Sequence, residues 1–191
     1  RKALELRVDY LVTMDADLQF DPEDIPRLLK PLMDGSADFV TGSRFSDPKY
    51  FPRGIPKVKH YGNIAMAGLV SLITGKRFKD VSCGFRAYTR ECLLHLNLKG
   101  HFTYTQESFI DLVAKQMRLE EVSVRVRYFE GRVSRVAGSV IRYGMKTSAI
   151  ILRALLDYRP LWMFSRLAGL LMLAGLLMAV PVIRNLLVVG T

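Results

Sequence analysis

The chain has 191 residues, half of them hydrophobic, and its 28 Lys and Arg against 18 Asp and Glu give a formal net charge of +10. This length allows one medium-sized core, or one domain together with a membrane anchor. The positive charge suits nucleic acid, anionic lipid headgroups and phosphorylated substrates equally well.

The cysteines and histidines exclude two classes of small domain. Cys83 and Cys92 form no CxxC pair and the three histidines are scattered, so the sequence has neither a zinc pattern nor a disulfide framework. Lone thiols of this kind fit a reducing, cytosolic catalytic part. The chain begins at Arg1 rather than Met and ends at Thr191 inside an apolar passage. We therefore expect it to be an internal piece of a longer protein.

Residues 1 to about 130 alternate between strand patterns and helix patterns. Strands are predicted at Tyr10–Met14, Ala37–Thr41, Phe85–Tyr88 and Leu119–Val126. Helices are predicted at Glu23–Met33, Lys57–Thr74, Arg90–Leu96 and Glu107–Met117. Strands that alternate with helices indicate an α/β sandwich, and ligands of such folds gather at the carboxyl ends of the strands.

The first predicted strand ends in two acidic residues, in the stretch LVTMDADLQFDP. Two carboxylates this close repel each other and are costly to desolvate unless a cation or several donors meet them. One interpretation is a strand that leads into a polar turn, with Asp21 capping the helix after Pro22. The other is a divalent metal site that includes Asp15 and Asp17. Their place at the carboxyl end of a strand favours the metal site.

Other polar segments lie next to the remaining predicted strands. Gly42-Ser43-Arg44 ends the second strand, and its arginine offers a planar fork that suits phosphate oxygens, although a plain surface arginine is the alternative. The segment DVSCGFR, residues 80–86, is a polar turn that leads into the third strand. Glu107 stands at a predicted helix start, where capping is the default explanation. The segment EGRVSR, residues 130–135, adds two arginines and a hydroxyl group.

The C-terminal part has the pattern of a membrane helix. Leu167–Ile183 contains no charged residue, and extension back to Leu161 gives about 23 residues, which is long enough to cross a bilayer. Arg166 would snorkel to the interface, where Trp162 also fits. A buried core helix is the alternative, but a core helix of this length rarely lacks a polar face. Leu186–Val189 looks like the beginning of a second span.

The segment before this span is basic. Val140–Leu156 has apolar residues at helical spacing, with Arg142, Lys146 and Arg153 elsewhere on the helix. A basic amphipathic helix directly before a span is typical of a helix that lies on an anionic membrane surface, although a solvated face packed on the domain is the alternative. Positive residues that flank a first span also favour the cytoplasmic side.

These motifs together resemble glycosyltransferase family 2, in particular its polyprenyl-phosphate, dolichol-phosphate mannose synthase-like branch. The matching blocks occur in the family's order over residues 10 to about 140, and they are MDADLQFDPEDIPRLL, DFVTGSRF, DVSCGFRAYTREC, TYTQES and GRVSR. The first block followed by GSR is quite specific, whereas TYTQES and GRVSR are looser matches. The resemblance implies a GT-A (Rossmann-like) fold and a membrane-bound enzyme. Such an enzyme moves a sugar from a nucleotide-diphosphate donor, such as GDP-mannose or UDP-glucose, to a polyprenyl or dolichyl phosphate, with inversion at the anomeric carbon.

The resemblance also implies roles for particular residues. Asp15, Asp17 and Gln19 would hold Mg²⁺ or Mn²⁺ against the donor diphosphate, because hard cations with oxygen ligands suit that task. Arg44 would contact phosphate, and Asp80 with the SCGFR turn would line the reaction centre. Three residues after the last strand, namely Arg132, Ser134 and Arg135, would meet the acceptor phosphate or close over the donor.

A lipid monophosphate is already an anion at neutral pH, so it needs little help from a general base. Glu107 and Asp111 remain candidates for a base, but capping or core support fits them better.

The predicted organisation is the C-terminal part of a GT-A catalytic domain over residues 1–135. A basic amphipathic juxtamembrane helix over 136–159 and a transmembrane segment over 160–191 follow it. The family's opening strand and loop, which grip the nucleotide base, are absent before Arg1, so this polypeptide alone would lack half its donor pocket. The loop between Arg44 and His60 should hold basic acceptor residues, and Arg53, Lys57 and Lys59 are candidates without assigned roles.

Two other functions stay open. A processive polysaccharide synthase resembles this fold but has a TED triplet and a QxxRW motif, whereas this sequence has TQE and no QxxRW. A non-catalytic membrane adaptor or a nucleic-acid binder would use the basic segment. The apolar C-terminus and the DADLQ block argue against nucleic acid as a partner.

Overall fold

The computed structural model describes residues 2–52, 54–98, 104–128, 152–153, 156 and 160–189. The chain divides into two compact units, Arg1–Ala154 and Leu155–Thr191. The predicted juxtamembrane helix over 136–159 lies almost entirely outside the described residues, so it remains a prediction.

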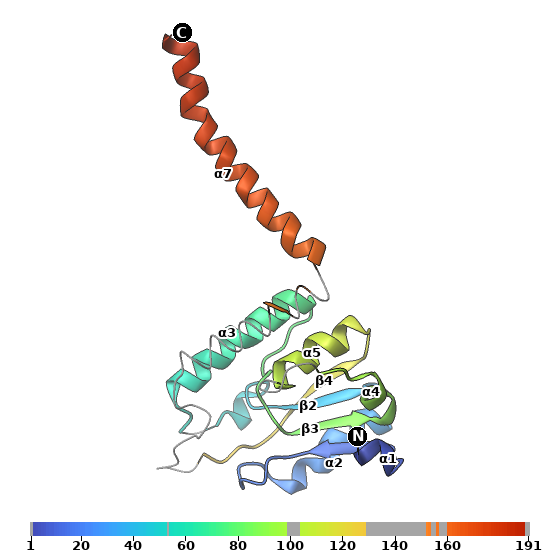
Figure 1. Ribbon diagram of the computed structural model, residues 1–191. Helices are drawn as coiled ribbons and strands as arrows, with labels where there is room; N and C mark the ends of the chain where they lie inside the picture. The colour runs from blue at the N-terminus through green and yellow to red at the C-terminus, as the bar shows by residue number, and fades with distance from the viewer. Residues whose placement is uncertain are drawn as a thin grey trace. The chain divides into compact units, whose positions relative to one another are not determined.

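A four-stranded mixed sheet organises the first unit (Figure 1). Its strands are β1 (Tyr10–Thr13), β2 (Phe39–Ser43), β3 (Arg86–Thr89) and β4 (Leu119–Ser123), in the order β1-β3-β2-β4. Strand β3 runs antiparallel to β1 and β2, and β4 runs parallel to β2. The ends of β1, β2 and β4 and the beginning of β3 therefore lie at one edge of the sheet. Among the predicted site residues that the structure describes, Asp15, Asp17, Arg44 and Asp80 lie in the segments next to this edge.

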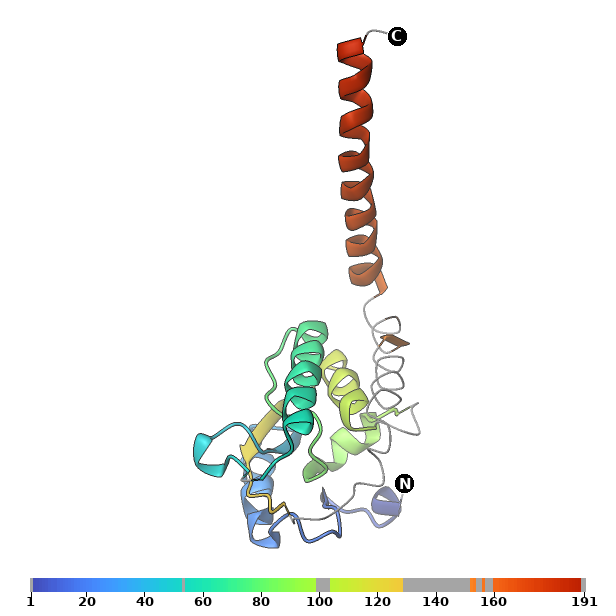
Figure 2. The same ribbon diagram turned by 90° about the vertical axis from the view of Figure 1, so that its left-hand side faces the viewer.

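Helices cover both faces of the sheet (Figure 2). Helix α2 (Ile25–Met33) follows the short turn η1 (Pro22–Asp24) and packs on one face against all four strands. Helices α3 (Lys57–Thr74) and α5 (Tyr104–Ala114) pack against each other, and α5 contacts β4. The remaining short elements are α1 (Lys2–Glu5), η2 (Pro48–Tyr50) and α4 (Arg90–His95).

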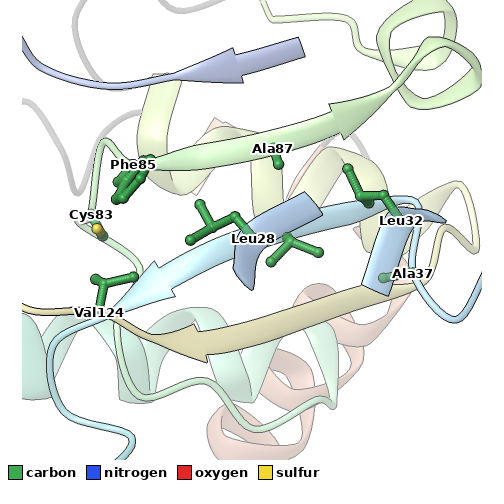
Figure 3. Packing of buried hydrophobic residues seen from close by; sticks show 8 residues of the cluster. Leu28, Leu32, Ala37, Cys83, Phe85, Ala87 and Val124 are labelled. Atoms are coloured by element: carbon green, nitrogen blue, oxygen red, sulfur yellow. The ribbon is translucent and has the colours of Figure 1, made fainter. Parts of the chain in front are cut away.

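The hydrophobic core between α2 and the sheet includes Leu28 and Leu32 of α2, Val40 of β2, Phe85 and the thiol of Cys83 (Figure 3). Because side chains alternate along a strand, Val40 faces α2 while its neighbour Phe39 faces α5, where its ring centroid lies 5.6 Å from that of Phe109. Gly42 also lies on the α2 face, where a Cβ would come within 2.8 Å of Val124 Cγ2. Glycine at this position therefore lets β2 and β4 pack closely at the edge that the site residues occupy.

The predicted elements agree with the structure in kind and differ at their ends. The helix predicted at Lys57–Thr74 has those bounds. The helix expected to begin at Glu107 begins three residues earlier, at Tyr104, so Glu107 lies in its first turn rather than at its cap. The strand expected to continue to Val126 ends at Ser123, and Val126 forms only an isolated bridge with Phe20. The segment after β4 bends there to meet the loop after β1.

The second unit contains helix α7 (Pro160–Val189). By length and composition, its part Pro160–Asn185 can cross a membrane. The guanidinium of Arg166 lies 4.1 Å from the ring centroid of Trp162, a cation–π contact between two residues predicted at the interface. The helix continues through Arg184 to Val189 without a turn, so a second span beginning at Leu186 remains a prediction.

Candidate active site

Two loops and one arginine form the polar edge of the sheet. The Asp15 loop (residues 14–20) follows β1, and the Asp80 loop (residues 79–84) leads into β3. The Thr13 hydroxyl donates a hydrogen bond to the Gly84 carbonyl oxygen at 3.2 Å, which ties the two loops together. Arg44 directly follows β2, the strand that pairs with β3. The fold thus brings together three segments that are far apart in the sequence.

The Asp15 loop presents its carboxylates toward solvent. Asp15 is exposed and Asp17 is half-buried, with Asp17 Oδ1 accepting a hydrogen bond from the Gln19 backbone N–H at 3.1 Å. Leu18 between them has φ +61° and is 81% exposed. A leucine in the left-handed region is unusual, and such backbone conformations occur preferentially at functional sites.

Gly84 forms a cradle for the Asp15 carboxylate. A Cβ at position 84 would lie 2.7 Å from Asp15 Oδ2, closer than Cβ atoms approach other atoms in proteins, and 3.2 Å from Asp15 Cγ, which is a tight contact. The glycine of the SCGFR turn therefore lets the exposed carboxylate rest against the backbone of the Asp80 loop, and a Cβ there would displace it from this position. The sequence had shown both motifs without showing that they touch.

The far end of the Asp15 loop is held by the segment that follows β4. The Gln19 carbonyl oxygen accepts a hydrogen bond from the Arg127 N–H at 2.9 Å, and Asp24 Oδ2 accepts one from the Arg125 N–H at 3.2 Å. Asp21 accepts from the Glu23 N–H at 3.1 Å, which confirms the predicted cap.

Asp80 is fully buried and is held by Arg44. Arg44 Nε and Nη2 donate to the two Asp80 carboxylate oxygens at 2.6 and 2.8 Å, and the Arg44 backbone N–H donates to Oδ2 at 3.1 Å. Arg44 Nη1 donates to the Tyr128 hydroxyl at 3.1 Å. Burial alone would lower the pKa of Arg44, but the hydrogen bonds and charge of Asp80 outweigh it and raise that pKa.

This pairing changes the interpretation of Arg44. Each nitrogen of its guanidinium already donates to a protein oxygen, which leaves two N–H groups for any ligand. The predicted phosphate contact is therefore restricted to those two groups and stays a prediction. What the structure adds is a second role, the fixing of Asp80.

Arg86 holds the second half of the Asp80 loop from inside the protein. Its fully buried guanidinium donates to the carbonyl oxygens of Cys83 at 2.8 Å and Thr105 at 2.9 Å, and to the Ser108 hydroxyl at 2.7 Å. Gln106 Nε2 donates to the Ser82 hydroxyl at 3.3 Å. The arginine of the SCGFR motif thus supports the loop and does not reach solvent.

The buried thiols show no sign of reactivity. Burial, with a further contribution from the charge of Asp80, raises the pKa of Cys83 to about 12, and burial raises that of Cys92 to about 12. A thiol with such a pKa is protonated at neutral pH, so neither cysteine suits the role of a nucleophile.

The oxygen atoms at this edge fit a divalent cation that is bound partly by the protein and partly by a substrate. Among the described residues no group of three His, Cys, Asp or Glu could hold a metal ion, so two carboxylates, Asp15 and Asp17, are what the loop offers. Mg²⁺ is typically bound by one or two carboxylates together with substrate phosphates.

The remaining predicted site residues fall into two groups. Arg132, Ser134 and Arg135 lie outside the described residues, so their roles stay predictions. The candidate base Asp111 is fully buried, where its carboxylate pairs with Lys115 at 2.8 Å and accepts from the Asn97 N–H at 3.0 Å. These contacts support the structural role expected for it.

Two residues that sequence reasoning missed contact the Asp80 loop, namely Asn63 on α3 and Glu121 on β4. Each had a signal. Asn63 is a buried amide in a stretch, residues 60–75, that contains no Asp, Glu, Lys or Arg. Glu121 follows Glu120 in a strand, and because side chains alternate, one of the two must point into the protein.

Helix α3 has apolar residues on both faces. Its buried face includes Ala67, Val70 and Ile73. Its outward face is formed by exposed apolar side chains, namely Val58, Tyr61, Ile64, Leu69 and Leu72. Exposed basic residues flank this face at both ends, namely Lys57, Lys59, Lys76 and Arg77. This combination is typical of a helix that contacts an anionic lipid surface.

The family and the relatives of the chain agree with the geometry. The family model described as "Glycosyl transferase family 2" matches residues 4–96. A UDP-N-acetylglucosamine–dolichyl-phosphate N-acetylglucosaminyltransferase of Methanococcus voltae is 30% identical over 149 residues, which are 76% of this chain and 58% of that protein. An undecaprenyl-phosphate 4-deoxy-4-formamido-L-arabinose transferase of Proteus mirabilis is 26% identical, over 95% of this chain and 52% of that protein. The chain thus spans little more than half the length of these relatives.

Solved structures show the same fold. Glucosyl-3-phosphoglycerate synthase from Mycobacterium tuberculosis, in complex with phosphoglyceric acid, superposes with a TM-score of 0.54 at 22% identity, over 78% of this chain and 49% of that one. The same synthase in complex with Mn²⁺, UDP-glucose and phosphoglyceric acid gives a TM-score of 0.52. The predicted GT-A fold is therefore confirmed. The chain contains a glycosyltransferase family 2 domain, which the family model matches over residues 4–96.

Proposed function

We propose that the protein carrying this chain transfers a sugar from a nucleotide-diphosphate donor to a polyprenyl or dolichyl phosphate at a membrane. The single observation that carries this proposal is the glycine cradle, which holds the Asp15 carboxylate at the strand edge while leaving it exposed. Such an arrangement suits a ligand that brings its own positive ion and phosphates. The two relatives named above support it, since both names include a prenyl-phosphate acceptor.

Each side of the site has a different task in the proposed reaction. Asp15 and Asp17, with Gln19 the least supported member, would hold Mg²⁺ or Mn²⁺ and through it the donor diphosphate. A cation there supplies positive charge to the diphosphate as it leaves. The Asp80 loop would border the anomeric carbon, with the Asp80 carboxylate buried behind it and paired with Arg44. The two remaining N–H groups of Arg44 would face phosphate oxygens.

The proposed transfer forms one bond and breaks one bond. An oxygen of the acceptor phosphate attacks the anomeric carbon of the donor sugar, and the bond from that carbon to the diphosphate oxygen breaks, with inversion. The acceptor phosphate is an anion at neutral pH, so no side chain has to remove a proton. This agrees with the buried, paired state of Asp111, one of the two candidate bases.

The lipid acceptor requires a membrane, and two parts of the chain support that location. Helix α7 is long and apolar enough to cross one. The outward face of α3 is apolar and flanked by basic residues, which suits the surface of an anionic leaflet. A catalytic part facing the cytoplasm is the orientation we propose, because basic residues near a span favour that side.

The test is a transfer assay on the full-length protein in membranes. Labelled GDP-mannose, UDP-glucose and UDP-N-acetylglucosamine are each incubated with polyprenyl phosphate and Mg²⁺ or Mn²⁺. We expect label in the lipid fraction with one donor, and loss of that label when the metal is chelated.

The control is the same assay without polyprenyl phosphate. A labelled polymer instead of a labelled lipid would favour the processive synthase, and absence of any metal-dependent product with every common donor would refute the proposal. A non-catalytic adaptor would likewise give no labelled product.

A further inference from the structure

One peptide group of the Asp80 loop is gripped at both ends. The Lys79 carbonyl oxygen accepts a hydrogen bond from Asn63 Nδ2 at 2.8 Å, and the Asp80 N–H on the same peptide donates to Glu121 Oε1 at 2.8 Å. The Lys79 N–H also donates to Glu121, at 2.9 and 3.1 Å to its two oxygens. A peptide plane held at its oxygen and its nitrogen cannot rotate without breaking one of these bonds.

We propose that Asn63 and Glu121 are positioning residues that orient Asp80 for sugar transfer; this inference rests on the proposed function. We call the pair the peptide clamp. It fixes the backbone of Asp80, while Arg44 fixes its carboxylate, so Asp80 is held from α3, β4 and the end of β2 at once.

Both clamp residues are polar side chains that are withdrawn from solvent, Asn63 almost fully and Glu121 in part. Glu121 is half-buried, and burial raises the pKa of its carboxyl above the ordinary value although the Lys79 and Asp80 N–H groups act in the opposite direction. Asn63 is buried in an otherwise apolar helix, and its Oδ1 has no hydrogen-bond partner in the described part of the chain. Buried polar groups cost stability unless they are hydrogen-bonded, and here the bonds go to one peptide group of the Asp80 loop.

Asn63 also connects the peptide clamp to helix α3. It lies on α3 one residue before Ile64, which belongs to the exposed apolar face that the proposed function assigns to lipid. The side-chain amide of Asn63 thus connects α3, the helix that would contact the membrane, to the Asp80 loop. The clamp therefore predicts that changes at Asn63 act on turnover, since the binding surface itself is left intact.

The first measurement is hydrogen–deuterium exchange on the full-length protein, with Glu121→Ala compared with Glu120→Ala. Glu120 is a matched control because it lies on the same strand and accepts from the Ser36 hydroxyl instead. Loss of a charge-assisted hydrogen bond should speed exchange of the Lys79 and Asp80 amides about tenfold or more in Glu121→Ala and leave them unchanged in Glu120→Ala. Unchanged exchange in both variants would overturn the clamp.

The second measurement separates positioning from support of the fold. We expect Asn63→Ala and Glu121→Ala to lower kcat about tenfold and to change KM for the donor less than about twofold, with partial rescue in Glu121→Gln. In an Asp80→Asn background, Glu121→Ala should cost less than about twofold, because positioning matters only while its target is present. Fully additive losses would overturn the inference, and Asn63→Ala decides it if Glu121→Ala does not fold.

The two proposals fail in different ways. If the unaltered protein transfers no sugar, the proposed function is refuted, while the exchange experiment still decides whether the peptide is clamped. If the unaltered protein is active and both clamp variants keep full kcat, the positioning role is refuted and the proposed function stands.

Discussion

The two loops at the edge of the sheet differ in how the protein holds them. The Asp80 loop is held by side chains of Asn63, Arg44, Arg86, Gln106 and Glu121, which come from or directly follow five different elements. The Asp15 loop exposes Asp15 and Leu18, and its contacts include the Asp17–Gln19 hydrogen bond within the loop and the backbone bond from Arg127 to Gln19 at its far end.

This difference indicates a division of labour. Groups whose position must be accurate during the reaction are fixed in advance, because no free energy is then spent on reorganising them in the chemical step. Groups that bind an incoming ion and diphosphate stay accessible, since the ligand itself supplies the missing partners. The Asp80 loop is complete without substrate, whereas we expect the Asp15 loop to be completed by substrate.

The largest effect is expected in the Asp80 loop when Asp80 loses its partner Arg44. Arg44→Met leaves the fully buried Asp80 carboxylate unpaired, and removing one partner of a buried pair costs about 3–5 kcal/mol of unfolding free energy. Denaturant unfolding measures it. The matched control is Lys30→Met, which breaks the exposed pair with Asp34 and should cost at most about 1 kcal/mol. Equal losses in the two variants would contradict the buried role of Asp80.

The Asp15 loop should show the opposite behaviour. Asp17→Asn keeps an oxygen for the Gln19 N–H but removes the charge. Turnover should fall about 10²–10³-fold, the usual cost of removing one electrostatic contact to the leaving group, while the unfolding free energy changes by less than about 0.5 kcal/mol. Steady-state rates at increasing Mn²⁺ and a melting curve give both quantities. An unchanged rate would remove the metal site.

The contact between the loops provides an intermediate effect. Gly84→Ala places a methyl group where Asp15 Oδ2 lies, and the exposed Asp15 side chain can turn away from it, so we expect a loss of less than about 1 kcal/mol in stability but a higher Mn²⁺ requirement. Gly68→Ala is the control, because a Cβ there meets nothing within 4 Å and alanine is favoured in a helix. An unchanged Mn²⁺ requirement in Gly84→Ala would show that the contact between Gly84 and the Asp15 carboxylate plays no part in metal binding.

The smallest effect is expected at the opposite edge of the sheet, where Arg118 pairs with Asp38 at 2.7 Å. The Arg118 hydrogen bonds lower the pKa of Asp38, so this pair stabilises the fold above the ordinary pKa of an aspartate, about 3.9, and the stabilisation is lost as the pH falls below it. Asp38→Asn should therefore lower the melting temperature at pH 7 more than at pH 3, without changing kcat. A change in kcat would mean that the Asp38–Arg118 pair affects catalysis at the opposite edge of the sheet.

Local patterns predicted the parts of this molecule that depend on neighbours in sequence. The apolar run before Asp15, the cap at Asp21 and the bounds of Lys57–Thr74 all follow from residues a few positions apart. The pairing of Arg44 with Asp80 joins residues 36 positions apart, and Glu121 meets Asp80 across 41. No pattern within one segment specifies such partners, because they depend on which strand ends the sheet brings together.

The measurement that tests the central claim most directly is amide exchange of both loops in one experiment on the full-length protein. Exchange is followed without ligand, and then with Mn²⁺ and UDP or GDP at concentrations shown to saturate binding. The account predicts that residues 79–84 are already protected without ligand and change little, while residues 14–20 exchange fast and become at least about tenfold slower with ligand. Residues 14–20 that stay unprotected when ligand is bound, or residues 79–84 that are equally labile without it, would contradict the account.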